Sequence, residues 1–200
     1  MNQNIDHFIP FSRPYLGKEE EQAVLSVLRS GWLTTGKESI AFENEFAAYV
    51  NAEYARALNS ATAGLHLSLE ALGVCEGDLV VTTPYTFTAT AEIVRYLGAD
   101  PLFVDIEGDS LNIDPDKVKL SLETYGEKIK VIVPVHVAGC PCDMEALCSL
   151  GGKYGTSIVE DSSHAFPSNT KMGYLGTIGD VGVFSLYANK PITTGEGGML

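Results

Sequence analysis

Short apolar runs alternate along this chain with segments whose apolar residues follow helical spacing. The segments of helical spacing cover residues 62–72, 86–97, 115–125 and 144–154. The apolar runs before, between and after them cover residues 55–58, 79–82, 102–104, 131–135, 158–159 and 181–184. A repeated strand–helix–strand order is typical of a parallel sheet whose faces are both covered by helices. The alternation therefore predicts an α/β fold with a mostly parallel sheet and helices on both faces.

The first 50 residues follow a different pattern. Apolar residues recur at helical spacing in 18–28 and again in 37–50, and a loop bounded by Gly31 and Gly36 separates the two stretches. We therefore divide the chain into an N-terminal helical segment with a loop, residues 1–50, and a large α/β domain, residues 51–200.

The composition of the chain indicates which binding partners and which cellular compartment to expect. The chain has 26 acidic residues against 13 Lys and Arg, a net charge of −13, which disfavours nucleic acids and anionic membranes as partners. No apolar run is long enough to span a bilayer, and residues 1–10 lack the features of a signal peptide. The four cysteines fit reduced thiols, and Cys140, Cys142 and Cys148 lack the paired spacing of zinc sites. We expect a cytoplasmic protein with no metal site.

Ligands of parallel sheets collect beyond the carboxyl ends of the strands, so the residues after each apolar run are candidates for a site. Residues 59–64 follow the first run and begin a helix, and their small side chains and the Thr62 hydroxyl suit a phosphate group. Residues 83–88 follow the second run, and an aromatic side chain there suits the face of a planar cofactor. Alone, each pattern is more typical of an ordinary helix cap or a core aromatic residue.

Two further strand ends carry charged residues. Asp161 ends the fifth run, where a buried acid needs hydrogen bonds or a cation, and a protonated pyridine nitrogen is such a cation. Lys190 follows the sixth run among apolar and small residues, and burial there would make its amine a nucleophile toward an aldehyde. The alternatives are an acid that caps the next segment and a solvated loop lysine.

These features supply, in chain order, a phosphate turn, an aromatic stack, an acid and an amine. The stretch 181–199 around Lys190 resembles the lysine signature of the DegT/DnrJ/EryC1/StrS family of sugar aminotransferases, which are pyridoxal-phosphate enzymes of fold type I. Residues 160–165 resemble the acid motif of that family, 84–89 its stacking motif and 31–36 its N-terminal substrate loop. The resemblance extends from Ile9 to Leu200.

The resemblance implies a role for each matching residue. Lys190 would hold the cofactor as a Schiff base and later carry protons, and Asp161 would pair with the pyridine nitrogen. His136, outside these motifs, we interpret from the sequence as a hydrogen-bonded core histidine. The remaining residues to which the resemblance assigns contacts are Ala61, Thr62, Ala63 and Ser185 at the phosphate, Phe87 on the ring face, His164 beside the ring, and Thr34 and Thr35 at the substrate.

By the same resemblance, a homodimer would transfer an amino group from glutamate to a nucleotide-linked keto-sugar, in cell-surface polysaccharide or deoxyaminosugar biosynthesis. We expect the family's small C-terminal domain to be absent and the last, antiparallel strand near residues 197–199 to be truncated, leaving the first and sixth strands without a shared neighbour. Two alternatives remain. One is a non-catalytic aminotransferase-like domain that binds cofactor or partner without turnover. The other, a nucleotide-binding module using residues 59–64, is disfavoured because no G-x-G-x-x-G follows the first run.

Overall fold

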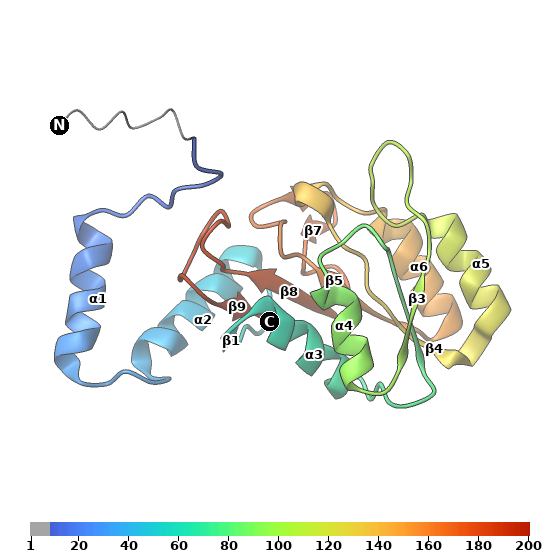
Figure 1. The fold of residues 1–200 in the computed structure, drawn as a ribbon, viewed down its shortest axis with the longest axis horizontal. Coiled ribbons are helices and arrows are strands. Elements are labelled where there is room, and N and C mark those ends of the chain that lie inside the picture. The colour runs from blue at the N-terminus through green and yellow to red at the C-terminus, as the bar shows by residue number, and fades with distance from the viewer. Residues whose placement is uncertain (1–8) are drawn as a thin grey trace, which may run out of the picture.

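A computed structural model describes residues 9–200, so the prediction about a signal peptide at residues 1–10 falls almost wholly outside the described residues. A seven-stranded sheet is covered by helices on both faces, and α1 stands apart from it (Figure 1). None of the described helices is long and apolar enough to cross a membrane. The helices are α1 Lys18–Ser30, α2 Lys37–Val50, α3 Ala61–Ala71, α4 Ala89–Tyr96, α5 Pro115–Tyr125 and α6 Met144–Tyr154, with the short 3-10 helices η1 Gly126–Lys128 and η2 Val137–Gly139.

The strands lie in the sheet in the order β1-β9-β8-β5-β4-β2-β3. Pairing is parallel from β8 through β5, β4 and β2 to β3, which confirms the predicted α/β fold. A separate hairpin of β6 and β7 was not predicted, because its four residues contain no apolar run. The strands are β1 Ala57–Leu58, β2 Leu79–Thr82, β3 Asp100–Phe103, β4 Ile129–Ile132, β5 Ser157–Asp161, β6 Asn169–Thr170, β7 Gly173–Tyr174, β8 Val181–Ser185 and β9 Gly198–Met199.

The antiparallel strand β9 lies where it was predicted, between the first and sixth apolar runs. Met199 pairs with Ala57 of β1 on one side and with Phe184 of β8 on the other. The expectation that β1 and β8 lack their shared neighbour is therefore wrong for these residues, since even two residues of β9 join both strands.

The sheet is buried on both faces, which explains why its strands read as continuous apolar runs. Val80 packs into the core beneath α3 and α4, whereas its neighbour Val81 packs into the core beneath α5 and α6. Val159 and Ile158 divide between the same two cores. Successive side chains of a strand point to opposite faces, so a strand covered on both sides needs apolar residues at every position.

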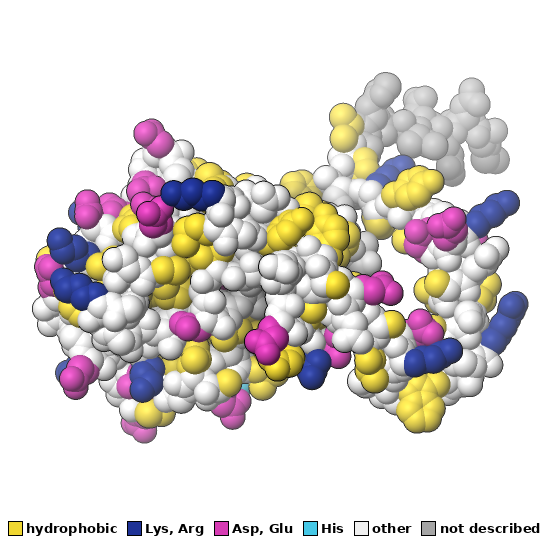
Figure 2. Space-filling model, turned by 180° about the vertical axis from the view of Figure 1, so that it is seen from behind, with side chains coloured by type: hydrophobic (Ala, Val, Ile, Leu, Met, Phe, Trp, Pro, Cys, Tyr) yellow, Lys and Arg dark blue, Asp and Glu magenta, His cyan; other side chains and the backbone are white. Residues whose placement is uncertain are grey.

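The two N-terminal helices differ in their packing. Phe46 of α2 contacts Phe184 of β8 with ring centroids 5.0 Å apart, so α2 joins the body of the sheet. By contrast, α1 has no buried residue, and Val24 and Leu28 are more than half exposed. Figure 1 and Figure 2 both show α1 standing away from the sheet. The domain boundary at residue 50 stays a prediction.

Gly182 of β8 tests how closely the loop after β7 packs against the sheet. A Cβ at this position would lie 1.8 Å from the carbonyl oxygen of Gly176, which belongs to the loop after β7. We predict that Gly182→Ala lowers the free energy of unfolding by about 3 kcal/mol, because backbone must move. Gly152 of α6 is the matched control, since no atom lies within 4 Å of its added Cβ. Gly152→Ala should raise stability by up to about 1 kcal/mol in urea denaturation. Equal stabilities of the two variants would contradict this packing.

Candidate functional site

A cavity of about 780 Å³ lies at the carboxyl ends of β2, β5 and β8, beside the N-terminus of α3. Parallel strands end at the same edge of a sheet, so turns far apart in the sequence meet here. The predicted site residues that line this cavity are Ala61, Thr62, Phe87, Asp161, His164, Ser185 and Lys190.

The N-terminus of α3 forms one wall of the cavity. The Ser60 side chain caps the helix by accepting a hydrogen bond from the amide of Ala63 at 3.1 Å. Ala63 does not line the cavity and its amide is already used, so its predicted phosphate contact gains no support. Ala61 and Thr62 do line the cavity, at a helix end where backbone amides favour an anion.

Gly198 of β9 lies directly against this turn. A Cβ on Gly198 would come within 2.5 Å of the Ser60 carbonyl group and within 2.6 Å of the Ala61 amide nitrogen. Only glycine lets β9 pass this close, so the position of the turn depends on the antiparallel strand as well as on α3.

Asp161 is the last residue of β5 and is 4% exposed. Its Oδ2 accepts a hydrogen bond from Thr90 Oγ1 at 2.8 Å, and its Oδ1 accepts one from the Ser163 amide at 3.2 Å. No Lys, Arg or His among residues 9–200 forms an ion pair with this carboxylate. A carboxylate offers about four acceptor sites, so a buried one with spare sites at a cavity suits a cationic ligand.

Lys190 and His164 line the same cavity. Burial lowers the pKa of the Lys190 amine, and the negative charge of Asp161 opposes that shift. Burial also lowers the pKa of His164, and the positive charge of Lys190 adds to the effect. Both shifts favour the neutral forms, and a neutral amine is the form that attacks an aldehyde.

Phe87 lies on the cavity wall with 77% of its surface exposed. Its carbonyl oxygen accepts a hydrogen bond from the amide of Thr90, at the start of α4. The alternative reading as a core aromatic is therefore wrong for Phe87. An exposed aromatic face beside a cavity suits a planar ligand.

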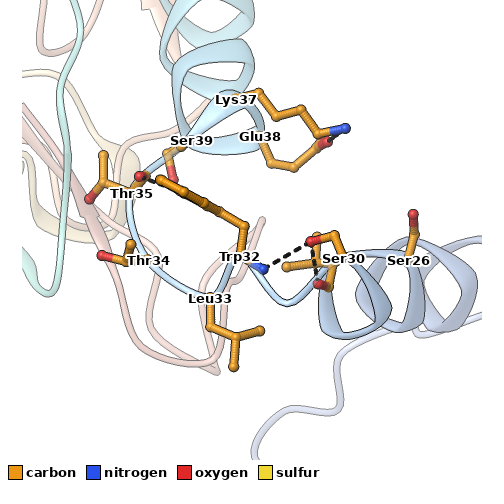
Figure 3. Close-up of a pocket in the computed structure, with 11 residues that line it drawn as sticks. Ser26, Ser30, Trp32, Leu33, Thr34, Thr35, Lys37, Glu38 and Ser39 are labelled. Carbon is orange, nitrogen blue, oxygen red and sulfur yellow. Dashed lines mark hydrogen bonds and ion pairs between the residues drawn. The ribbon is translucent and has the colours of Figure 1, made fainter.

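Thr34 and Thr35 lie elsewhere. They line a second cavity of about 390 Å³ between the end of α1 and the start of α2. Figure 3 shows Trp32 lying across this loop, where its Nε1 donates a hydrogen bond to the carbonyl oxygen of Thr35 at 3.0 Å. The structure thus does not bring the predicted substrate threonines into the cavity of Lys190.

His136 and Glu160 form a buried hydrogen-bonded pair, and the sequence analysis identified only His136. His136 is fully buried, and its Nδ1 accepts a hydrogen bond from the Cys142 amide at 3.1 Å. Its Nε2 therefore carries the proton and donates to Glu160 Oε2 at 2.8 Å. These contacts confirm the interpretation of His136 as a hydrogen-bonded core histidine. Glu160 was not singled out as a site residue.

Glu160 holds the loop after β7 against β5. Its two oxygens accept hydrogen bonds from the amides of Gly176, Ile178 and Gly179 at 2.6 to 2.9 Å, besides the bond from His136. Burial raises the pKa of Glu160, but these hydrogen bonds outweigh burial and leave the pKa below 4.5.

Among the described residues, no group of three or more His, Cys, Asp or Glu side chains is arranged to hold a metal ion.

Comparisons with known proteins agree on one family. A model of the DegT/DnrJ/EryC1/StrS aminotransferase family matches residues 14–200. The spore coat polysaccharide biosynthesis protein SpsC of Bacillus subtilis strain 168 is 46% identical over 200 residues, which make up 100% of this chain and 51% of SpsC.

Solved structures give the same result. The aminotransferase TlmJ of Streptoalloteichus hindustanus is 38% identical with a TM-score of 0.90, over 96% of this chain and 52% of TlmJ. Spr1654 of Streptococcus pneumoniae in its PLP-form is 36% identical with a TM-score of 0.88, over 96% of this chain and 52% of Spr1654. The chain therefore spans about half the length of these relatives.

The hydrogen bonds that Glu160 accepts predict that the free energy of unfolding depends on pH. We expect Glu160→Gln to lower the free energy of unfolding by about 3 kcal/mol at neutral pH, because the amide group must face hydrogen-bond donors. The pKa of Glu160 is lowered on folding, so its stabilisation is present above 4.5 and lost as pH falls through the lower folded value. Acid unfolding of the variant should therefore depend less on pH below 4.5. The control Glu145→Gln, whose partner Lys171 is exposed, should leave the free energy of unfolding nearly unchanged, because a solvated surface ion pair contributes little.

Lys190 should react as an amine of lowered pKa. We predict that reductive methylation at Lys190, followed by mass spectrometry against pH, has a midpoint below 10.5. Asp161→Asn should move that midpoint lower still, because the acid's negative charge favours the ammonium form. Asp116→Asn on α5 should leave the midpoint unchanged. A midpoint that rises in Asp161→Asn would contradict the assigned electrostatics.

Proposed function

The chain belongs to the DegT/DnrJ/EryC1/StrS aminotransferase family, and on that premise we propose that it carries the cofactor half of an enzyme that transfers an amino group from glutamate to a nucleotide-linked keto-sugar. The family's members are sugar aminotransferases, and their cofactor is pyridoxal phosphate. The likeness to SpsC, a spore coat polysaccharide biosynthesis protein, supports a place in cell-surface polysaccharide or deoxyaminosugar biosynthesis. The observation that carries the proposal is the shared cavity of Lys190, Asp161 and the α3 N-terminus.

The residues of the cavity fit the chemical groups of pyridoxal phosphate. The amides of Ala61 and Thr62 and the hydroxyl of Ser185 would hold the phosphate. Phe87 would lie on the ring face, and the buried carboxylate of Asp161 would pair with the ring nitrogen. The fit rests on a helix N-terminus, an exposed aromatic side chain and an acid without a cationic partner among the described residues.

When bound, pyridoxal phosphate withdraws electrons from the carbon that carries the amino group. Asp161 would keep the ring nitrogen protonated, which strengthens that withdrawal. Lys190 would hold the cofactor through its Nζ and then, as a free amine, take a proton from the carbon of the amino donor and return it at the cofactor. His164, whose pKa is lowered by burial and by the charge of Lys190, would lie beside the ring.

The substrate and assembly parts of the proposal rest on other residues. Thr34 and Thr35 would contact the nucleotide-sugar from the loop after α1. A homodimer is supported by the exposed Tyr85 and Tyr187 at the cavity, because subunit interfaces are enriched in aromatic side chains. We propose a cytoplasmic location, with neither nucleic acid nor membrane as partner.

A spectroscopic titration tests the cofactor assignment. We predict that the chain gains a visible absorption band when pyridoxal phosphate is added, and that Lys190→Ala does not. Lys171→Ala is the control, since this lysine is exposed and lines neither cavity. A folded wild-type chain without a band would sink the proposal.

Adding glutamate to the loaded chain then separates an enzyme from a binding domain. Loss of the visible band with formation of 2-oxoglutarate supports transamination. A stable band supports the non-catalytic alternative, in which the chain binds cofactor without turnover.

A further inference from the structure

We propose that Thr90 is the positioning residue that orients Asp161 toward the cofactor, and that Thr86 completes the same hydrogen-bond chain. The inference rests on the proposed function, because it assumes that Asp161 meets the ring nitrogen. Neither threonine belongs to the residues that the sequence analysis assigned to the site.

The direction of each hydrogen bond follows from the donors available. Thr90 is fully buried on α4, and its Oγ1 lies 2.8 Å from Asp161 Oδ2. An ionised carboxylate only accepts, so Thr90 donates its single hydroxyl proton to Asp161. Thr86 Oγ1 lies 2.8 Å from Thr90 Oγ1 and must therefore be the donor of that bond. The chain runs from Thr86 to Thr90 to Asp161.

This arrangement fixes the plane of the Asp161 carboxylate. One oxygen is held by Thr90 from α4 and the other by the Ser163 amide from the turn after β5. Each oxygen keeps one acceptor site that these bonds do not use. Without the Thr90 hydroxyl, only the Ser163 amide holds the carboxylate, which could then rotate about its Cβ–Cγ bond and turn its spare sites away from the cavity.

Thr90 also links the acid to the stacking residue. Its amide donates a hydrogen bond to the carbonyl oxygen of Phe87 at 3.2 Å, while its hydroxyl reaches Asp161. One residue of α4 thus sets the position of the aromatic wall relative to the acid. A planar ring that lies on Phe87 and meets Asp161 depends on that spacing.

Thr82 shows what a purely structural buried threonine looks like in this fold. It is fully buried on β2, and its Oγ1 donates to the carbonyl oxygen of Val133 at 2.9 Å. Thr82 does not line the cavity, and its acceptor is backbone rather than an acid. The two threonines are equally buried and differ in what they hold, so Thr82 is a matched control.

The experiment measures dissociation constants of the 200-residue chain and its variants by absorbance titration. The probes are pyridoxal phosphate and its 1-deaza analogue, in which a C–H group replaces the ring nitrogen. We expect Thr90→Val to weaken binding of pyridoxal phosphate about tenfold, since the Asp161 carboxylate is no longer held toward the ring nitrogen and its charged hydrogen bond to the ligand is weakened. Binding of the 1-deaza analogue, which offers Asp161 no N–H group, should change little. Thr90→Ser should restore the wild-type affinity, and Thr82→Val should leave both affinities unchanged.

Each other outcome has a defined meaning. Equal weakening of both probes by Thr90→Val would overturn the inference, because a general packing defect does not distinguish the ring nitrogen. Unchanged affinities in Thr90→Val would also overturn it and would leave the proposed function standing. Failure of the folded wild-type chain to bind pyridoxal phosphate would overturn the proposed function and this inference together.

Discussion

Parallel pairing of β2, β4, β5 and β8 is the constraint on which the rest of the structure depends. Because these strands run in one direction, the chain leaves each of them at the same edge. Phe87, Asp161 and Lys190 are separated by many residues in sequence, yet they line one cavity for this reason. The helices that cover both faces make the parallel arrangement stable, since they bury the apolar residues at every strand position.

The antiparallel strand β9 adds a second constraint at the same edge. It lies between β1 and β8, and Gly198 lets it pass against the turn that begins α3. The turn that begins α3 is thus held from two directions, by β1 before it and by β9. A larger residue at position 198 would displace backbone atoms of Ser60 and Ala61 rather than a flexible side chain.

Much of the fold could be predicted because its signals are local. The spacing of apolar residues gave helices at 37–50, 115–125 and 144–154 with the bounds that the structure has. Thr90 and Glu160 could not be recognised, because their importance lies in contacts with residues distant in the sequence. Thr34 and Thr35 line a separate cavity because of how α1 lies relative to the sheet. No local sequence pattern predicts that position of α1. A buried acid was expected at Asp161, but what holds it came only from the structure.

Glu160 and Asp161 show how hydrogen bonding separates a buried acid that only stabilises the fold from one with acceptor sites left for a ligand. They are neighbours on β5, so their side chains point to opposite faces of the strand. The Glu160 carboxylate accepts four hydrogen bonds, which match the acceptor sites of its two oxygens and leave none for a ligand. The Asp161 carboxylate accepts two and faces a cavity. Both acids are buried, so exposure does not distinguish them. The two acids differ in their unused acceptor sites, and only Asp161 has such sites available for a cationic ligand.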